Sequence, residues 1–453
     1  MVKFPIPPTI KQFATRFSEA GFSIYIVGGA VRDYYAGYSS HDYDFATDAL
    51  PNEVMALFPK VIPTGIKHGT VTVLFRDEML EVTTFRVDGE YHDSRRPSTT
   101  TFVRSLEEDL KRRDFTINAL AIEVSSGKLI DLHHGIQDIK AKTIRAIGDP
   151  VQRFTEDALR IMRACRIGAQ LQFGIEEATQ KAMQTLSENL ALVSGERIRS
   201  ELFNLLDSPV PSIGLFALHE CHALSVILPE LTAGNNIMQK GNHQHDIMRH
   251  NIYACDAAPR NKPLVRLAAL LHDIGKVAVR KEQSDGEVSF YQHEFHSEKM
   301  AIEIMERLKC SNAEKNTVAN LIRNHMFHYN EDWSDGAVRR FINRVGLEAL
   351  EDLFDLRLAD QTAIYGRAYP ESLHALKDHI ERVLKASSAL KIKDLAVDGN
   401  DLATLSIPRG PIMGLVLQEL LDTVLDDPQQ NQRETLLKIA KQFYEQRINI
   451  EKS

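Results

Sequence analysis

The sequence lacks long apolar runs, and it contains little cysteine or tryptophan. Four of its 453 residues are cysteines and one is a tryptophan. The cysteines stand apart, without the Cys-x-x-Cys spacing of a zinc or redox site, which indicates reduced thiols. No segment approaches the roughly 18 apolar residues of a membrane span, and the start, Met1–Pro5, has no signal-peptide core. We therefore expect a cytoplasmic protein that does not contact a membrane.

An excess of basic residues is also absent. The chain has 54 Lys and Arg against 62 Asp and Glu, which gives a net charge of -8 and a pI near 6.1. Nucleic-acid binding depends on where the cations cluster rather than on the total, so this balance does not exclude it. A single hydrophobic core stops growing at about 250 to 300 residues, so we expect several domains.

A pair of glycines follows the first predicted strand. The run Ser23–Val27 is β-branched and aromatic, which is typical of a strand. Gly28 and Gly29 would let the chain turn tightly there and allow a triphosphate to approach the backbone. Arg32 follows in the next predicted helix, where we expect it to contact phosphate. Taken alone, a Gly-Gly pair is more often only a turn.

Two aspartates stand in a second predicted strand, near residues 42–46. Because side chains alternate along a strand, Asp42 and Asp44 are expected on one face. Two carboxylates on one face suit two divalent ions, which serve phosphoryl transfer by activating the attacking hydroxyl and stabilising the leaving pyrophosphate. Magnesium, which prefers oxygen ligands, is the expected ion. An isolated Asp-x-Asp is more often a solvated loop, but its position after the glycine pair favours a catalytic site.

A third carboxylate normally completes such a site from a neighbouring strand. Glu81, in the alternating run Leu80–Phe85, is the candidate for this third catalytic position. A glutamate that faces water from an edge strand would give the same pattern, so both interpretations stay open.

Three cations precede a helix that we expect to begin near Asp114. Lys111, Arg112 and Arg113 would bring positive charge to the free amides of that helix, where a triphosphate binds well. Arg113 is the predicted phosphate contact. Asp114 and Asn118 lie one helical turn apart and could both address a ribose. The alternative role for Asp114 is a helix N-cap.

Further along, an acid and three arginines occupy one predicted helical face: Asp157, Arg160, Arg163 and Arg166. A carboxylate and a guanidinium held side by side offer acceptors and donors, as the edge of a base does. Asp157 and Arg160 could therefore read cytosine or adenine. In isolation the pattern indicates a salt-bridged solvent face, because Glu156 and Arg160 have the favourable i,i+4 spacing. Its position after the phosphate motif favours base reading.

Together these segments resemble the bacterial class II tRNA nucleotidyltransferases, the CCA-adding enzymes, and their relatives the bacterial poly(A) polymerases. The resemblance covers at least residues 20–175. It implies that Asp42 and Asp44 bind magnesium and that tRNA, CTP and ATP are the substrates. The residues expected at the nucleotide are Gly28, Gly29, Arg32, Asp33, Arg112, Arg113, Asp114, Asn118, Asp157, Arg160, Arg163 and Arg166.

Members of this family add C, C and A to the tRNA 3′ end without a nucleic-acid template. The charged segment 86–97 matches the element that is associated with switching from CTP to ATP, and members that add only C often lack it. Its presence favours full CCA addition, or addition of the terminal A after a partner enzyme has added the two cytidines. Poly(A) polymerase is a further alternative. From its residues alone, 86–97 is either a mobile loop over the site or an ordinary surface loop.

A second segment, Leu267–Lys276, resembles the HD phosphohydrolase superfamily. The four residues that match its metal ligands are His250, His272, Asp273 and Asp360. The resemblance implies that they bind one divalent ion, of unknown identity, that activates water for phosphoester hydrolysis. Three more histidines could line the pocket or bind a second ion: His293, His296 and His325. An HD fold that only supports tRNA is the alternative.

We therefore expect an α+β protein in which an N-terminal α/β head is followed by helices. The head, with a polymerase-beta-like nucleotidyltransferase fold, is expected at residues 1–148 and a helical neck at 149–233. An HD domain would follow at 234–395, and a helical tail that grips tRNA at 396–453. Two other classes are an HD phosphohydrolase with an inert head and a non-catalytic RNA-binding protein, and the intact ligand residues disfavour both.

Overall fold

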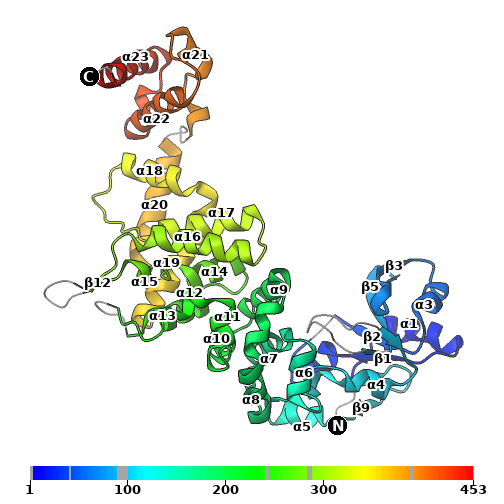
Figure 1. Cartoon of the computed structure of the whole chain (residues 1–453). Coiled ribbons are helices and arrows are strands. Elements are labelled where there is room, and N and C mark those ends of the chain that lie inside the picture. Colours follow the sequence, from blue (N-terminus) through cyan, green and yellow to red (C-terminus); the bar gives the residue numbers. More distant parts are fainter. Residues whose placement is uncertain are drawn as a thin grey trace. The chain divides into compact units, whose positions relative to one another are not determined.

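A seven-stranded mixed sheet lies in the N-terminal part of the chain, and helices form nearly all of the rest (Figure 1). The computed structural model describes residues 4–39, 42–88, 100–239, 244–282, 288–386 and 391–451. The chain divides into two units, one of residues 1–235 with 304–310 and the other of residues 236–303 with 311–453. The expected α+β fold is confirmed.

The sheet has the strand order β3-β4-β5-β2-β1-β8-β9. In that order the strands are Val61–Gly65, Thr70–Phe75, Glu78–Thr84, Asp44–Thr47, Ile24–Val27, Leu120–Glu123 and Leu129–Asp131. Strands β2 and β5 run parallel, and the other neighbouring pairs are antiparallel. Strand β5 is thus an interior strand, so the alternative that Glu81 belongs to an edge strand is wrong.

Six short elements flank this sheet or connect its strands. They are α1 (Pro8–Glu19), α2 (Gly29–Tyr35), α3 (Pro51–Leu57), α4 (Leu106–Lys111), the 3-10 turn η2 (Thr116–Asn118) and α5 (Gly135–Lys140). Helix α1 forms because its apolar residues recur at helical spacing, which buries Phe13 and Phe17 on one side. Replacing a fully buried phenylalanine such as Phe13 by alanine typically costs about 3–5 kcal/mol.

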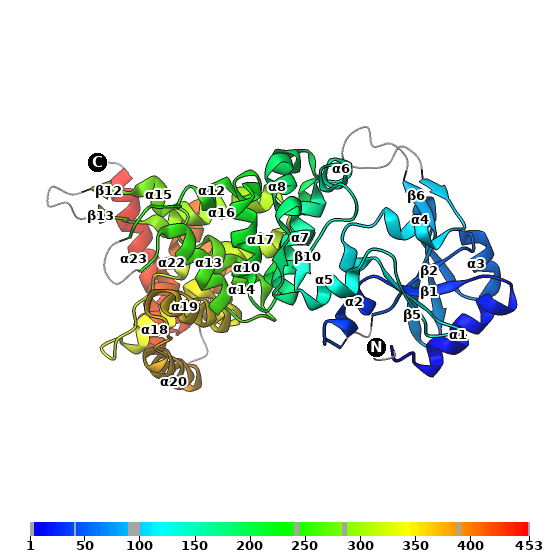
Figure 2. The same ribbon diagram turned by 90° about the horizontal axis from the view of Figure 1, so that it is seen from below.

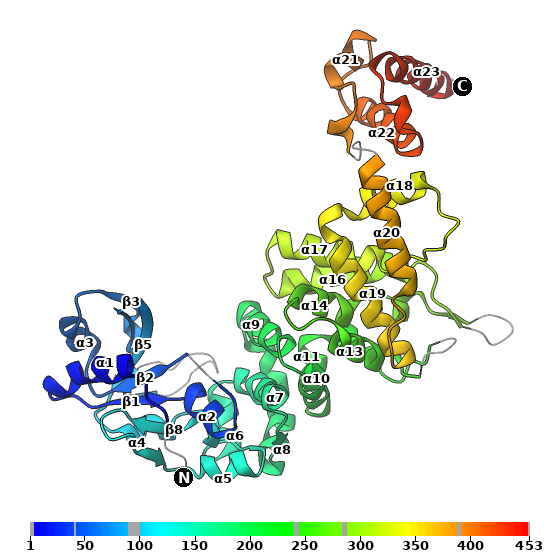
Figure 3. The same cartoon turned by 180° about the vertical axis from the view of Figure 1, so that it is seen from behind.

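The two faces of the sheet are covered by different helices. Phe45 of β2 packs against Phe13 of α1, with ring centroids 5.1 Å apart. On the other face, Val27 of β1 shares a core with Leu110 of α4. Figures 2 and 3 show α1 and α4 on opposite sides of β1 and β2. Asp44 stands opposite Val27 in the antiparallel register, so its side chain belongs to the α4 face.

A bundle of helices completes the first unit. Its helices are α6 (Pro150–Glu156), α7 (Leu159–Leu171), α8 (Glu177–Leu186), α9 (Gly195–Leu206), α10 (Pro211–Glu220), α11 (Ala223–Ile227) and α12 (Pro229–Thr232). Helix α6 begins where Asp149 caps the Val151 N–H and Pro150 opens the first turn. Gly214 lets α10 approach α7 closely, because a Cβ there would lie only 2.8 Å from the Cys165 carbonyl oxygen.

The second unit is helical apart from one short hairpin in its described part. Its longer helices are α13 (Ile247–Ala257), α14 (Pro263–Leu271), α16 (His293–Arg307, whose end belongs to the first unit), α17 (Asn312–Asn324), α18 (Asp335–Val345), α19 (Leu350–Tyr365), α20 (Glu371–Ala386), α22 (Pro411–Asp426) and α23 (Arg433–Glu451). The last two share a core that includes Leu420, Leu421 and Leu436. Across the described residues, every helix is too short or too polar to cross a membrane.

Candidate functional site

One pocket of about 580 Å³ in the first unit brings together most of the residues that the sequence predicted for the nucleotide site. The predicted residues that line it are Gly28, Gly29, Arg32, Asp44, Glu81, Arg112, Arg113, Asp114, Asn118, Asp157, Arg160, Arg163 and Arg166. Asp33 and Asp42 are not among the lining residues. The pocket therefore combines the β1–α2 turn with β2, β5, the segment after α4, and α7.

The glycine pair forms the turn between β1 and α2. Gly28 has φ +71°, a backbone conformation that side chains rarely adopt, and a Cβ there would lie 3.5 Å from Arg113 Nη1. Arg32 Nη1 donates to Asn118 Oδ1 at 2.8 Å, and Arg32 Nε donates to Asp33 Oδ1 at 2.8 Å. The role of Asp33 in this structure is thus to hold the guanidinium that reaches into the pocket.

Asp44 and Glu81 lie side by side. They are register partners on the parallel strands β2 and β5, which places both on one face. Strand β2 begins at Asp44. Asp42 is exposed and lies just before the strand, whereas the sequence predicted it within the strand. Among the described residues, these three carboxylates do not form a group of ligand atoms within 4.8 Å of one another.

The electrostatics of Asp44 fit a cation. Its side chain is exposed on one side, but the protein packed around the rest of it raises its pKa to about 6, with further contributions from Glu81 and Asp42. Negative groups that crowd one another disfavour their own ionisation, and a divalent ion removes that repulsion. The residues present therefore suit a divalent metal in the head.

The cations before Asp114 do not precede a helix, so that prediction is wrong. Helix α4 ends at Lys111, and the next helical residues are those of the short turn η2. The intervening backbone instead bonds to the strand-like segment near residue 146: Thr116 N–H donates to the Arg145 carbonyl at 3.0 Å, and Ile147 N–H donates to the Asp114 carbonyl at 3.1 Å. These bonds replace the i to i−4 bonds that a helix would need.

Arg112 and Arg113 are held by Asp109, which lies one turn earlier on α4. Arg112 Nη2 lies 2.7 Å from Asp109 Oδ1, and Arg113 Nη2 lies 3.1 Å from Asp109 Oδ2. Burial alone would raise the pKa of Asp109, but the two guanidiniums outweigh it and hold that pKa below its usual value. One carboxylate thus positions two cations and leaves this wall of the pocket net positive.

Asp114 is buried and connects three partners. Its Oδ1 accepts hydrogen bonds from Asn118 Nδ2 at 2.9 Å and from the Phe115 N–H at 2.8 Å, and its Oδ2 accepts one from Arg163 Nε at 2.8 Å. Burial would raise its pKa, but Arg163 outweighs burial and holds the pKa well below the usual range. The N-cap alternative is wrong, because Phe115 occupies the N-cap position of η2 and makes no side-chain capping bond there.

Asp157 and Arg160 both line the pocket but do not belong to one helical face as predicted. Asp157 follows the end of α6, and its Oδ2 lies 2.7 Å from Arg197 Nη2 of α9. Arg160, in the first turn of α7, is held by Glu156 Oε2 at 2.7 Å. Each of the two side chains is therefore oriented by a partner of its own.

Three acids and bases that support the pocket were missed from the sequence: Asp109, Arg197 and Glu201. Asp109 could have been found from its spacing, because it stands three and four residues before Arg112 and Arg113. Glu201 Oε2 lies 2.6 Å from Arg166 Nε. No local signal marks Arg197 or Glu201, since the packing of α9 on α7 brings Arg197 to the pocket and Glu201 to the arginines that line it. Arg86, in the described start of segment 86–97, also lines the pocket, whereas residues 89–97 lie outside the described residues.

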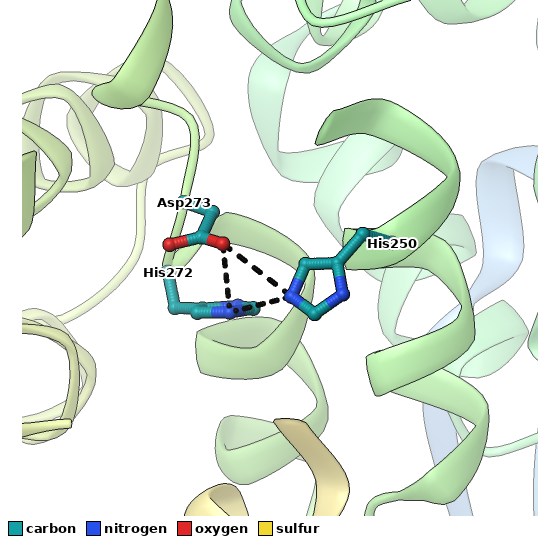
Figure 4. A group of neighbouring side chains, drawn as sticks. All are labelled: His250, His272 and Asp273. Carbon is teal, nitrogen blue, oxygen red and sulfur yellow. Dashed lines mark hydrogen bonds and ion pairs between the residues drawn. The ribbon is translucent and has the colours of Figure 1, made fainter. Parts of the chain in front are cut away.

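A second cluster, in the other unit, gathers all four predicted HD ligands. His250 Nε2 lies 3.2 Å from His272 Nε2, 3.4 Å from Asp273 Oδ2 and 3.2 Å from Asp360 Oδ1. The side chains come from α13, from the residues after α14, and from α19. Figure 4 shows His250, His272 and Asp273 converging. All four residues are buried.

Asp273 belongs to two groups of ligand atoms, each within 4.8 Å: one with His250 and His272, the other with His293 and His325. Its Oδ2 faces the first group, and its Oδ1 lies 3.0 Å from His293 Nε2 and 3.7 Å from His325 Nε2. The structure thus places His293 and His325 in the cluster, whereas His296 is exposed on α16.

The charges in this cluster also fit metal binding. Burial would lower the pKa of His272, but Asp273 and Asp360 outweigh it and raise that pKa to about 10. The pKa values of Asp273 and Asp360 lie well below the usual range despite burial, because the histidines stabilise their charges. The buried carboxylates of Asp273 and Asp360 carry a negative charge that a neighbouring cation would neutralise. Carboxylate oxygens and histidine nitrogens are together suitable ligands for a divalent metal ion.

Three family models match successive parts of the chain. The "Poly A polymerase head domain" matches residues 24–145, and the "Probable RNA and SrmB- binding site of polymerase A" matches residues 172–234. The model for "tRNA nucleotidyltransferase domain 2" matches residues 288–440. Both units of the structure therefore contain segments that are typical of nucleotidyltransferases acting on RNA.

Known proteins match over nearly the whole chain. The CCA-adding enzyme of Lactobacillus johnsonii is 35% identical over 92% of both chains, and that of Lactobacillus gasseri is 37% identical over 91% of both. The CCA-adding enzyme of Leuconostoc mesenteroides is 55% identical over 42% of this chain, a match that spans about half (48%) of that relative. The crystal structure of the Bacillus stearothermophilus CCA-adding enzyme in complex with CTP is 28% identical, with a TM-score of 0.73 over 98% of this chain and 100% of that one. The chain therefore belongs to the family of the CCA-adding enzymes.

Proposed function

We propose that the protein adds C, C and A to the 3′ end of tRNA, using CTP and ATP and no nucleic-acid template. The observation that carries this proposal is the pocket in the first unit. Its walls contain several arginines, the carboxylates of Asp44 and Glu81 on adjacent strands, and the pair Asp157 and Arg160 that we expect to read the base. Because tRNA, CTP and ATP occur together in the cytoplasm, the reaction would take place there.

The phosphates would lie at the positive end of this pocket. Gly28 lets the triphosphate approach the backbone, and Arg32 and Arg113 would contact it. Asp109 keeps Arg112 and Arg113 in place, so they need not reorganise when the nucleotide binds. Asp114 and Asn118, already bonded to each other, would address the ribose.

The reacting groups would lie at Asp44 and Glu81. The tRNA 3′-hydroxyl would attack the α-phosphorus, and pyrophosphate would leave. Magnesium, held by Asp44 with Glu81 and Asp42, would supply charge neutralisation and activation of the hydroxyl. The chain contributes by holding Asp44 and Glu81 in register on adjacent strands, which aligns the two carboxylates before the substrates arrive.

The incoming base would be read by Asp157 and Arg160. A carboxylate accepts hydrogen bonds and a guanidinium donates them, so together they can pair with the edge of cytosine or adenine. Arg197 and Glu156 fix the two side chains separately, which permits one of them to shift when CTP is exchanged for ATP.

Extension of defined tRNA transcripts tests the proposal. Transcripts that end at the discriminator base, at C and at CC are incubated with labelled CTP and ATP, separately and together. Growth of all three to CCA is the expected result. Extension of only the CC-ending transcript, by one A, would instead make the protein an A-adding enzyme that depends on a CC-adding partner. Unlimited A addition to transcripts of any sequence would favour a poly(A) polymerase.

A second activity, metal-dependent phosphoester hydrolysis, is supported by the cluster around Asp273. We assign residues 234–395 to this domain, after a head at 1–148 and a neck at 149–233, and residues 396–453 to a tail that contacts tRNA. His250, His272, Asp273 and Asp360 would hold one divalent ion, and Asp273, His293 and His325 a second. Such an ion lowers the pKa of a bound water and so supplies a nucleophile.

Hydrolysis of small phosphomonoesters and phosphodiesters by the full chain, loaded in turn with Mg²⁺, Mn²⁺, Co²⁺ or Ni²⁺, tests this activity. Turnover is expected with at least one metal and is expected to vanish in His272→Ala. Release of product by His272→Ala at the wild-type rate would assign the hydrolysis to a contaminant and contradict the proposal.

A further inference from the structure

The nucleotide pocket extends past Asp44 and Glu81 onto three residues that the proposed reaction has not yet used. Thr83 of β5, Thr70 of β4 and Arg86 of β6 (Arg86–Asp88) all line it. Thr83 stands two residues after Glu81 on β5, so both side chains belong to the same face of the sheet. In the sheet, β2 separates β5 and β4 from β1, which leads into the glycine turn. We call Thr70, Thr83 and Arg86 the far wall of the pocket.

The two threonine hydroxyls of the far wall bond to each other. Thr70 and Thr83 are register partners on the antiparallel strands β4 and β5, and their Oγ1 atoms lie 3.0 Å apart. Two hydroxyls have two protons, and the bond between them uses one. The pair therefore retains a proton to donate and lone pairs to accept, and both threonines are only partly buried. Such a pair can bond to a further hydroxyl, such as that of a ribose.

Arg86 brings a cation to the strand end where this pair lies. Its Nη1 donates to the carbonyl oxygen of His68, which stands two residues before Thr70. Its backbone is fixed separately, because the Arg86 N–H donates to Asp109 Oδ1 at 3.4 Å and its carbonyl accepts from Arg112 Nε at 2.9 Å. A guanidinium has five N–H donors, so it can contact a phosphate and keep its bond to His68. The far wall thus combines a cation with hydroxyls, which suits a ribonucleotide.

The direction of nucleotide addition decides which ribonucleotide lies at the far wall. In phosphoryl transfer the attacking and leaving oxygens lie roughly in line, on opposite sides of the phosphorus. The triphosphate is placed at Gly28 and Arg113, next to β1, so the pyrophosphate leaves toward that side. The attacking hydroxyl must then approach Asp44 and Glu81 from the opposite side, which is the side of β5 and β4.

We propose that the far wall binds the 3′-terminal nucleotide of the RNA that is extended. The hydroxyl pair of Thr70 and Thr83 would bond to its ribose 2′-hydroxyl, and Arg86 would contact its 5′ phosphate. This inference rests on the nucleotide addition proposed above and names residues that select the RNA end. The 2′-hydroxyl distinguishes RNA from DNA, so the far wall would make addition specific for an RNA end. Because none of these contacts involves the base, the same wall can hold an end in the discriminator base, in C or in CC.

The same sheet provides a matched control for the hydroxyl pair. Threonines opposite each other on neighbouring strands also stabilise a sheet, so a purely structural pair is the alternative. Thr64 of β3 and Thr72 of β4 form a second pair of this kind, with Oγ1 atoms 3.1 Å apart. Thr72 lies two residues after Thr70 on the same strand, but neither Thr64 nor Thr72 is among the lining residues of the pocket. Replacing both by valine therefore removes a hydroxyl pair from β4 outside the far wall.

The test is extension by the full chain, with ATP, of CC-ending tRNA whose terminal cytidine carries either a ribose or a 2′-deoxyribose. For wild-type protein, kcat/KM should be about fivefold lower with the deoxyribose end. The double variant Thr70→Val, Thr83→Val keeps the side-chain shape and should lose about fivefold with the ribose end, at an unchanged KM for ATP. It should extend both ends equally well. The control variant Thr64→Val, Thr72→Val should keep the wild-type preference, as should Thr83→Ser, which retains the hydroxyl.

Arg86→Met tests the phosphate contact separately. It should raise KM for tRNA about tenfold and leave the preference for the ribose end in place, because the hydroxyl pair is still present. Equal extension of both ends by wild-type protein, or a wild-type preference in the double valine variant, would overturn the far wall as the site of the RNA end and leave nucleotide addition standing. Failure of wild-type protein to extend the ribose end at all would overturn the proposed function, and this inference with it.

Discussion

Arg163 Nε donates to Asp114 Oδ2 at 2.8 Å, and this pair ties the segment before β8 to helix α7. Asp114 is buried, and Arg163 is the partner that keeps its carboxylate ionised there. The two residues both line the pocket. The geometry of the nucleotide site therefore depends on an ion pair that the sequence separates by 49 residues.

Arg163→Met should destabilise the first unit by about 1–3 kcal/mol, because it leaves a buried carboxylate without its main partner. With Arg163 present, the pKa of Asp114 is depressed, so the pair stabilises the fold above the usual carboxyl pKa and its contribution is lost as the pH falls. Without Arg163, burial raises the pKa of Asp114, so the loss of unfolding free energy in the variant is smallest at low pH, where Asp114 is protonated. The gap in unfolding free energy between wild type and variant should widen as the pH rises from about 4 to 7.

Urea unfolding of both proteins at several pH values checks this prediction. Lys181→Met, on an exposed side chain of α8, is the control and should show no such trend. A constant gap across the pH range would mean that Asp114 does not depend on Arg163 for its ionisation.

Glu81→Gln should lower the rate of nucleotide addition at least a hundredfold, and Asp44→Asn should lower it further. Both changes remove a negative charge from the pair that is expected to hold the catalytic metal. The measurement is single-turnover extension of a CC-ending tRNA with ATP. Glu78→Gln is the matched control, because it removes the same charge at the exposed start of the same strand. An unaffected rate in Glu81→Gln would exclude it as a catalytic carboxylate.

Arg197→Met should reduce discrimination between correct and incorrect nucleotides about tenfold, since Asp157 then loses the partner that orients it. Arg197→Lys, which keeps the charge but not the planar geometry, should restore part of the discrimination. The readout is the ratio of kcat/KM for CTP, ATP, GTP and UTP on one transcript. An equal loss with all four nucleotides, at unchanged ratios, would assign Arg197 to general stability instead.

The Asp273 cluster should bind two divalent ions for each chain, and His293→Ala should bind one. His293 belongs only to the second of the two ligand groups that share Asp273. His296→Ala, on the same helix but exposed, is the matched control and should keep both ions. The number of ions bound per chain is measured by mass spectrometry of the metal content after dialysis. Nucleotide addition should be unchanged in both variants, and a single ion in wild-type protein would contradict the second site.

The sequence alone was enough to predict the elements whose signals are local. The glycine turn and the aspartate pair each occupy a few neighbouring residues, so chemistry and spacing mark them as candidates without coordinates. The four HD ligands are predicted by the resemblance to the HD phosphohydrolase superfamily, which depends on their order along the chain. Helix α1 (Pro8–Glu19) likewise forms where apolar residues recur at helical spacing. In these segments local propensity and tertiary packing favour the same conformation.

Predictions from local sequence patterns were wrong where long-range interactions determined the backbone conformation. The expected helix at Asp114 is absent because the backbone of residues 114–116 forms hydrogen bonds with residues 145 and 147. The sequence near residue 114 contains no pattern that predicts these partners. Asp157 and Arg160 have the spacing of one helical face, but the break between α6 and α7 leaves Asp157 outside the helix, where it pairs with Arg197 of α9. Arg160 keeps its local i,i+4 partner Glu156, so the long-range pairing concerns Asp157 alone.

By itself, the sequence determined the family, the α+β class and the kinds of side chains available for catalysis, because these follow from residue type, order and local periodicity. Only the tertiary structure decided that Glu81 lies on an interior strand beside Asp44, that Arg197 holds Asp157, and that His293 and His325 share Asp273. These relationships join residues that are far apart along the chain. They arise from strand register and helix packing, which depend on how the whole core closes rather than on any single segment.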